Sequence, residues 1–353
     1  YNLEKLYTRM QIMYKEGMFN KSRLLKIIND FIYFPDNTNS DKKIICRYPQ
    51  YYAVTKLHDN ILKNIKPKGE GKGGTYFGST GSGKSLAMLF LSRILMKDKQ
   101  LKNPTILLIT DRTDLERQLS KLFVNSKNFL GDNKVKKILS RNDLKEELKN
   151  RLSGGVYLTN IQKFTEDIDL LSERSNIICI SDEAHRSQLN LEATHVYTEN
   201  GVEKKYGFAK YLHDSLPNAV YVGFTGTPID ETIDVFGEIV DSYTMTDAVE
   251  DGIIVNMVYD GRAARVNVDN EKVKEIEDYY KQCAEEGANE YQIEASKKAI
   301  LNINTIIGDS DRLQSVAEDF IELYEQRIEE QSTVKGKAMF VCLNKVTCVR
   351  MYN

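Results

Sequence analysis

The sequence predicts an α/β fold in which helices cover both faces of a parallel sheet. From residue 73 onward, short apolar runs rich in β-branched residues alternate with amphipathic helical segments. The apolar runs comprise residues 75–77, 105–110, 156–159, 177–181 and 219–224. This alternation is typical of parallel strands, because each crossover between them usually contains a helix.

Composition places the chain among ordinary globular proteins. Its 353 residues are about twice the length of a typical domain, so we expect two domains. Hydrophobic residues make up 41% and charged residues 28%, which excludes collagen-like and disordered chains. The formal net charge of -2 excludes a generally basic surface. Any nucleic-acid contact must therefore come from a local groove.

Three further absences in the sequence favour a cytoplasmic protein. No run approaches the roughly 18 uncharged apolar residues of a membrane span, so we expect no membrane contact. The five cysteines include no Cys-x-x-Cys pair, which suits a reducing compartment. The four histidines lack the spacing of a zinc site.

The elements before the first motif and after the main sheet suggest where the domains lie. Residues 1–40 are expected to form a helical connector from a missing N-terminal domain, ending near Pro35 and the polar run that follows. Residues 41–240 contain the alternating strands and helices, and we expect them to form one nearly complete lobe. Residues 241–353 are expected to begin a second lobe.

The second lobe has its own predicted elements. Apolar runs predict strands at 253–259 and 338–342, a charged helical region covers 271–330, and a helix begins at Asn344. The charge run reads more simply as a solvated helix face than as a binding site. Because the chain opens without Met and stops inside a helix, we expect it to be a fragment of a longer protein.

A glycine-rich loop follows the first strand of the predicted sheet and precedes an apolar helix at 86–96. The loop consists of Gly78, Ser79, Thr80, Gly81, Ser82, Gly83, Lys84 and Ser85, which fits the P-loop pattern G-x-x-x-x-G-K-[ST]. Its backbone N–H groups and the helix N-terminus can surround the phosphates of ATP. Lys84 would reach the β- and γ-phosphates, and the Ser85 hydroxyl would bind Mg²⁺.

A pair of acids follows the strand at 177–181. Asp182, Glu183, Ala184 and His185 lie where a strand ends, and open α/β sheets bind ligands at the carboxyl ends of their strands. Asp182 can hold Mg²⁺ through water, and Glu183 can act as the general base on an attacking water. His185 is either a structural histidine or a relay between the nucleotide and the rest of the protein.

These two motifs together resemble the superfamily 2 helicase-like motors. Other segments resemble the restriction (motor) subunit of type I restriction–modification enzymes, and the likeness extends over nearly the whole chain. Those segments are residues 47–54, 110–119, 161–164, 181–188, 223–228, 236–252 and 337–342. The resemblance implies two RecA-like lobes that use ATP and Mg²⁺ to pump double-stranded DNA. It also implies methyltransferase and specificity subunits as partners.

The resemblance further assigns roles to particular residues. Gln50 would read adenine, with Arg47 stacking or pairing nearby, although either residue alone could be an ordinary surface residue before a helix. Backbone contacts with DNA would come from Thr110, Asp111, Arg112, Thr159 and Lys163. Coupling of hydrolysis to lobe movement would involve Thr225, Gly226 and Thr227.

The sequence departs from the family pattern in two places, and two other functions are compatible with the motifs. The family's nuclease residues have no match in residues 1–40, and its arginine motif of the second lobe has no match before Asn353. We therefore expect this fragment neither to cut DNA nor to turn over ATP by itself. The rivals are a strand-separating DNA or RNA helicase and a nucleotide-binding scaffold without catalysis. The Thr225–Pro228 stretch disfavours the RNA group, and the presence of Lys84, Asp182 and Glu183 disfavours the scaffold.

Overall fold

A computed structural model describes residues 15, 17–36, 42–132, 134–163, 170–185, 193–198, 201–206, 208–261, 310–330 and 337–352. The chain divides into two compact units, Tyr1–Asn256 and Met257–Asn353, and each is described by itself.

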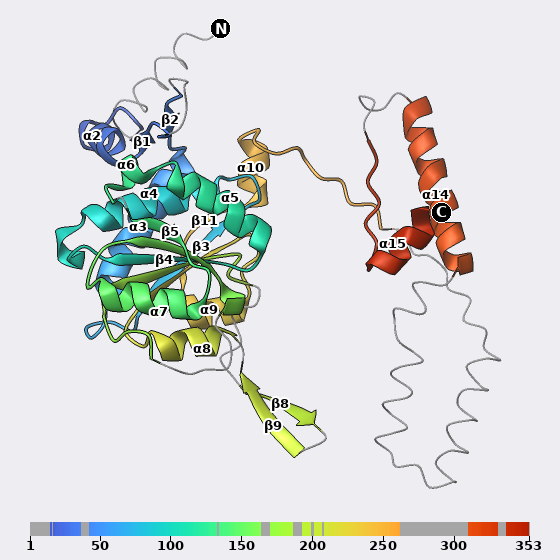
Figure 1. The fold of residues 1–353 in the computed structure, drawn as a ribbon. Helices are drawn as coiled ribbons and strands as arrows, with labels where there is room; N and C mark the ends of the chain where they lie inside the picture. The colour runs from blue at the N-terminus through green and yellow to red at the C-terminus, as the bar shows by residue number, and fades with distance from the viewer. Residues whose placement is uncertain are drawn as a thin grey trace. The chain divides into compact units, whose positions relative to one another are not determined.

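The first unit is built on a seven-stranded sheet in the order β11-β3-β10-β7-β4-β6-β5 (Figure 1). Every strand pair in this sheet is parallel. The strands are β3 (Lys72–Gly78), β4 (Thr105–Thr110), β5 (Val135–Lys137), β6 (Val156–Asn160), β7 (Ile177–Asp182), β10 (Val220–Thr225) and β11 (Ile239–Tyr243). All five strands expected from the apolar runs are present, and the α/β fold with a parallel sheet is confirmed.

Helices cover both faces of this sheet (Figure 1). One face carries α3 (Tyr48–Asn64), α4 (Lys84–Lys97) and α5 (Thr113–Val124), whose apolar residues join one buried cluster. The other face carries α7 (Arg141–Asn150), α8 (Phe208–Ser215) and α9 (Asp230–Phe236), which join a second cluster. The interior strand β4 is buried along its whole length, as its run of four consecutive apolar residues suggests.

Smaller elements complete the described part of the first unit. These are α2 (Lys21–Asp30), α6 (Lys127–Leu130), α10 (Met245–Glu250), the short 3₁₀ turns η1 (Lys99–Leu101) and η2 (Ile161–Lys163), and the antiparallel pairs β1 (Ile32–Tyr33) with β2 (Ile44–Ile45) and β8 (Ala193–Thr198) with β9 (Gly201–Tyr206). The helix α2 lies within the expected connector, whose first 14 residues lie outside the described residues.

The boundary between the units falls after Asn256, later in the chain than the expected division at residue 240. Strand β11 crosses residue 240 and pairs with β3, with Tyr243 opposite Gly78. Helix α10 follows, and its Ala248 is part of the first unit's core. The segment 239–250 therefore completes the first sheet.

The strand expected at 253–259 is wrong. The backbone N–H groups of Ile253 and Ile254 donate to the carbonyl of Ala248, which turns the chain back onto the end of α10. Beyond them, Val255 to Tyr259 have no regular structure, and the Tyr259 side chain is 95% exposed. The apolar run is long enough for a strand, but it has no partner strand among the described residues.

In the second unit, the described residues form α14 (Ser310–Glu329) and α15 (Lys345–Tyr352). The helix expected from Asn344 is confirmed, and the Asn344 side chain caps it by accepting from the Thr347 N–H at 2.8 Å. The strand expected at 338–342 is wrong, because these residues have no ladder and Met339 and Val341 are exposed. Of the charged region 271–330, the part before residue 310 lies outside the described residues.

Candidate nucleotide and nucleic-acid site

The carboxyl ends of three adjacent strands bring the predicted motifs together. In the sheet, β10 lies between β3 and β7, with Thr225 opposite Phe77 and Phe224 opposite Asp182. The phosphate loop leaves β3, the acid pair ends β7, and the Thr225 loop ends β10. All three groups therefore meet at one edge of the sheet, where open α/β sheets bind ligands.

The phosphate loop has the backbone shape that its glycines allow. Gly81 and Gly83 adopt φ of 83° and 84°, the left-handed region that residues with a β-carbon avoid. A β-carbon on Gly83 would also lie 2.4 Å from Gln50 Nε2. Helix α4 begins immediately afterwards, at Lys84, so its unpaired N–H groups face the loop. The Lys84 ammonium donates to the Gly78 carbonyl at 3.0 Å.

Gln50 lies against this loop and is only 2% exposed. Its Nε2 donates to the Gly83 carbonyl at 3.1 Å, and its Oε1 accepts from the Arg47 N–H at 2.8 Å. Arg47 is the N-cap of α3, so the helix start and the phosphate loop are joined through one amide. Reading of adenine by Gln50 stays a prediction, and it would require the amide to exchange these protein partners.

The acid pair is held in an unusual electrostatic and conformational state. Burial, with the negative charge of Glu183 adding to it, raises the pKa of Asp182 to about 6, although Lys84 opposes the shift. Glu183 has φ of 49°, a left-handed conformation that is uncommon for a residue with a side chain. Such strain is concentrated at functional sites. The Glu183 N–H donates to Asp182 Oδ1 at 3.1 Å.

His185 connects the acid pair to the next motif. Its Nδ1 lies 2.7 Å from the Thr225 hydroxyl and 3.5 Å from Glu183 Oε2. The Thr225 hydroxyl also accepts from the Thr227 N–H at 3.1 Å. A β-carbon on Gly226 would lie 3.6 Å from the Lys84 ammonium nitrogen. The Thr225 loop thus contacts the histidine, and its Gly226 lies close to Lys84 of the phosphate loop.

Several hydroxyls at this end of the sheet are buried without a hydrogen-bond partner. They belong to Ser79, Thr110 and Ser181. Buried polar groups normally have partners, so those near the phosphate loop fit a polar ligand. No group of three acidic, histidine or cysteine side chains that could hold a metal occurs among the described residues.

The loops expected to contact DNA leave the neighbouring strands β4 and β6. Arg112 is the N-cap of α5 and is exposed, whereas the side chains of Thr110 and Thr159 are buried. Asp111 lies between the threonine and the arginine, and Lys163 ends η2. Contacts of these residues with DNA stay predictions, and Arg112 has the most accessible side chain among those the structure describes.

Comparison with known proteins identifies the family. The profile of the SWI2/SNF2 ATPases matches residues 49–293, which is more than half of the chain. The chain belongs to this family. Membership accounts for the phosphate loop and the acid pair at one sheet edge, and it establishes a helicase-like ATPase domain that uses a nucleotide.

Curated relatives of this SWI2/SNF2 chain are type I restriction enzyme endonuclease subunits, as the resemblance indicated. The HindI endonuclease subunit of Haemophilus influenzae is 36% identical over 96% of this chain and 31% of its own length. The putative MjaIXP endonuclease subunit of Methanocaldococcus jannaschii is 31% identical over 98% of this chain and 31% of its own length. The chain therefore spans about a third of these relatives.

Among solved structures, the UvsW helicase of bacteriophage T4 matches 69% of this SWI2/SNF2 chain and 76% of its own chain, at 17% identity and a TM-score of 0.41. Within the described ranges of the chain, no helix is long and apolar enough to cross a membrane.

Sequence reasoning missed one group beside the phosphate loop of this SWI2/SNF2 chain. The hydroxyls of Tyr48 and Tyr243 both donate to Asp251 Oδ2, at 2.6 and 2.8 Å. The Tyr243 carbonyl accepts from the Ser79 N–H at 2.8 Å, so this tyrosine joins the loop to α10. Burial and the bond to Asp251 raise the pKa of Tyr243 to about 12. The sequence signal available for Tyr243 and Asp251 was the family likeness over residues 236–252, but that likeness assigned no role to these two residues.

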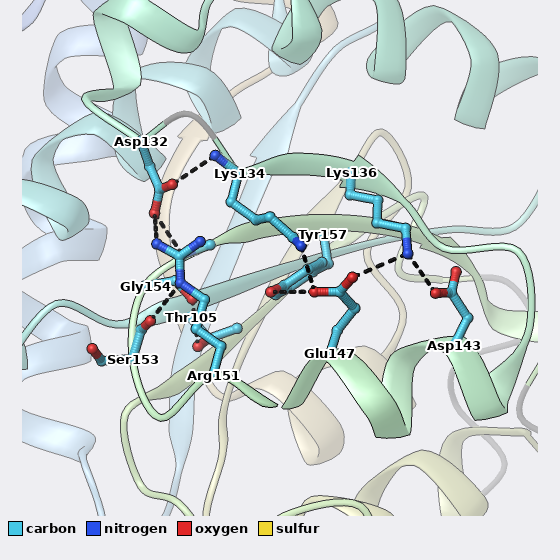
Figure 2. Close-up of polar contacts among 11 residues, drawn as sticks. Thr105, Asp132, Lys134, Lys136, Asp143, Glu147, Arg151, Ser153, Gly154 and Tyr157 are labelled. Carbon is cyan, nitrogen blue, oxygen red and sulfur yellow. Dashed lines mark hydrogen bonds and ion pairs between the residues drawn. The ribbon is translucent and has the colours of Figure 1, made fainter. Parts of the chain in front are cut away.

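A second polar cluster, also missed, lies at the β5 edge of the sheet (Figure 2). Glu147 accepts from the ammonium groups of Lys136 and Lys134 and from the Tyr157 hydroxyl. The remaining members pair Lys136 with Asp143, and Arg151 with Asp132. We call this set, with Gly155 bound to Asp132, the edge network. Its cations and carboxylates are paired with one another, which marks it as structural.

Proposed function

We propose that this chain is the ATP-hydrolysing motor part of a type I restriction enzyme, and that it uses Mg²⁺ and ATP to move double-stranded DNA. The contact of the phosphate loop, the acid pair and the Thr225 loop at one sheet edge is the observation that carries the proposal. In a motor, the residues that hydrolyse the nucleotide must act on the residues that move. Here His185 contacts Thr225, and Gly226 lies close to Lys84.

The phosphates of ATP would bind over the loop between Gly78 and Ser85. Lys84 would exchange the Gly78 carbonyl for the β- and γ-phosphates, while the backbone N–H groups at the start of α4 would bind the oxygens. Asp182 and Ser85 would hold Mg²⁺, which when bound neutralises charge on the phosphates. The raised pKa of Asp182 fits this role, since a nearby cation would favour its ionised form.

Glu183 would polarise the attacking water as general base. Its neighbour His185, bonded to Thr225, gives the acid pair a direct connection to the loop after β10. Loss of the γ-phosphate would change the electrostatic potential at the acid pair and His185. Through Thr225 to Thr227, the change would reach the chain that continues to α9, and thus couple hydrolysis to movement.

DNA would contact the loops after β4 and β6 through its phosphates, without base readout. Arg112 and Lys163 would supply the positive charge, and a near-neutral chain such as this one must concentrate its contacts locally. Sequence choice would belong to methyltransferase and specificity subunits, in a cytoplasmic complex. These partners are inferred from the relatives' names as restriction enzyme subunits.

The proposal is tested by two variants with different expected failures. Lys84→Ala removes a charge-assisted phosphate contact, so ATP affinity measured by calorimetry should fall about tenfold or more. Glu183→Gln should bind ATP normally, but in a protein as long as the curated relatives its DNA-stimulated phosphate release should fall about 100-fold or more. Unchanged ATP affinity in Lys84→Ala would contradict the nucleotide site proposed at this loop. Unchanged turnover in Glu183→Gln would contradict the role of Glu183 as general base.

A further inference from the structure

Asn160 occupies a distinctive place at the end of β6. It is 3% exposed and lies opposite Thr110 in the register between β4 and β6. It therefore sits at the carboxyl edge of the sheet, between the two loops that follow these strands. Neither the P-loop nor the acid pair involves this residue.

The amide nitrogen and the amide oxygen of Asn160 each make a hydrogen bond, one to each loop. Its Nδ2 donates to the backbone carbonyl of Asp111 at 3.1 Å, and its Oδ1 accepts from the backbone N–H of Gln162 at 2.8 Å. The first bond spans 49 residues of sequence and holds the loop after β4, while the second holds the turn η2. One buried side chain thus fixes two surface loops to each other.

The two loops fixed in this way carry candidate cationic contacts. Arg112 directly follows the carbonyl that Asn160 holds, and Lys163 directly follows the N–H that it holds. Surface loops are generally more mobile than the elements that they connect. A bond to the backbone beside each cation restricts that mobility.

We propose that Asn160 is a positioning residue that sets the spacing between the Arg112 loop and η2, so that both contact one nucleic-acid backbone. This inference rests on the proposed function, because it needs DNA to bind at these loops. Preorganised contacts bind more tightly, since the ordering cost is met during folding. Asn160 itself need not touch DNA.

The test measures binding of the 353-residue chain to labelled duplexes of unrelated sequence over a range of salt concentrations. Asn160→Leu removes both loop bonds while keeping a similar volume. The dissociation constant should rise about tenfold at low salt, and the slope of log affinity against log salt should flatten by about one. Calorimetry with ADP should give wild-type affinity, because the phosphate loop is untouched.

Asn218→Leu is the matched control. Asn218 also joins two loops, donating to the Glu173 carbonyl at 2.8 Å, but it precedes β10 and so lies at the opposite end of the sheet. This variant should leave the salt slope unchanged. Arg112→Ala should flatten the slope by about one, and combining it with Asn160→Leu should add less than the two separate effects.

The outcomes separate this inference from the proposed function. If Arg112→Ala leaves the slope unchanged, DNA does not bind at this loop and both ideas fail. If Arg112→Ala flattens it but a folded Asn160→Leu keeps the wild-type slope, only the positioning role fails. Loss of ADP affinity in parallel with DNA affinity would show a general structural role and also overturn it. Should Asn160→Leu not fold, Asn160→Asp, which keeps the acceptor for Gln162, is judged by the same slope.

Discussion

The first unit contains two polar regions that lie at different places on one sheet and differ in how their groups are satisfied. In the edge network, Glu147, Asp143 and Asp132 each accept from a cation, and Tyr157 adds its hydroxyl (Figure 2). At the carboxyl end of the sheet, where the phosphate loop lies, the hydroxyls of Ser79, Thr110 and Ser181 are buried without partners.

The carboxyl pKa of Asp182 moves in the opposite direction from those of Asp143 and Glu147 in the edge network. The pKa of Asp182 is raised, chiefly by burial. The pKa of Asp143 is lowered by the Leu139 N–H and by Lys136, and that of Glu147 is lowered because bonds from Lys136 and Lys134 outweigh its burial. Ionised carboxylates are therefore stabilising in the edge network and costly at the site. The contrast teaches that one region holds the fold together while the other is arranged for a ligand.

The largest expected effect is on the free energy of unfolding when Asp182, in the candidate site, is changed. Asp182 titrates near 3.8 when unfolded and at about 6 when folded, so its ionisation costs stability above pH 6, and the cost disappears as pH falls to 4. Without nucleotide, Asp182→Asn should therefore stabilise the protein by about 3 kcal/mol at pH 7. Denaturant unfolding from pH 4 to pH 8 measures this difference, which should shrink toward zero at pH 4.

The same variant should weaken Mg²⁺-dependent nucleotide binding, so stability and binding should change in opposite directions. Asp143→Asn, in the edge network, is the control, because it loses the charge that pairs with Lys136 and one of the two oxygens that accept from Lys136 and the Leu139 N–H, so it should gain no stability. A loss of stability in Asp182→Asn at pH 7 would contradict the idea that this carboxylate is held at a cost.

The second prediction concerns Glu147 in the edge network. Glu147→Gln keeps the shape of the side chain but removes the charge that binds Lys134 and Lys136, and it should destabilise the protein by about 1 to 2 kcal/mol at pH 7. The lowered pKa of Glu147 makes its contribution present above the unfolded pKa of 4.5 and lost as pH falls below it. The effect should therefore fade in acid, unlike that of a packing defect.

Nucleotide affinity gives the second measurement on this variant. Calorimetry with ADP should report the wild-type value for Glu147→Gln, since the edge network lies beyond β4 and β6 from the phosphate loop. A fall in ADP affinity together with stability would mean that the two regions are coupled and that the comparison is wrong.

The sequence could predict the central part of the fold because its signals there are local. The run 105–110 has four consecutive apolar residues between two threonines because β4 is buried on both faces, and the glycines of the P-loop report a backbone shape directly. The order of the strands is not part of this prediction: the structure places β10 between β3 and β7, which brings Lys84, Asp182 and Thr225 together.

Other features depend on partners that are distant in sequence. The segment 253–259 is as apolar as a strand, but whether it forms one depends on a neighbour that accepts its ladder. Strand β5 is three residues long and carries Lys136 and Lys137, so it has little apolar signal of its own. The bonds from Asn160 to Asp111 and from Tyr48 to Asp251 span 49 and 203 residues, distances at which local patterns give no register.

The smallest expected effect tests the comparison most directly, because it concerns a single unpaired hydroxyl. Removing a buried hydroxyl that has a partner usually costs about 1 kcal/mol, whereas removing one without a partner should cost almost nothing. Ser79→Ala should therefore change the free energy of unfolding by less than about 0.5 kcal/mol in the absence of nucleotide. Ser92→Ala is the matched control, since Ser92 is equally buried but donates to the Met88 carbonyl at 2.8 Å, and it should destabilise the protein by about 1 kcal/mol. If the Ser79 hydroxyl is kept for a ligand, Ser79→Ala should instead lower ATP affinity a few-fold, which calorimetry would measure. A Ser79→Ala variant that loses as much stability as Ser92→Ala and binds ATP normally would show that the unpaired hydroxyls are part of the fold, and the distinction between the two regions would not hold.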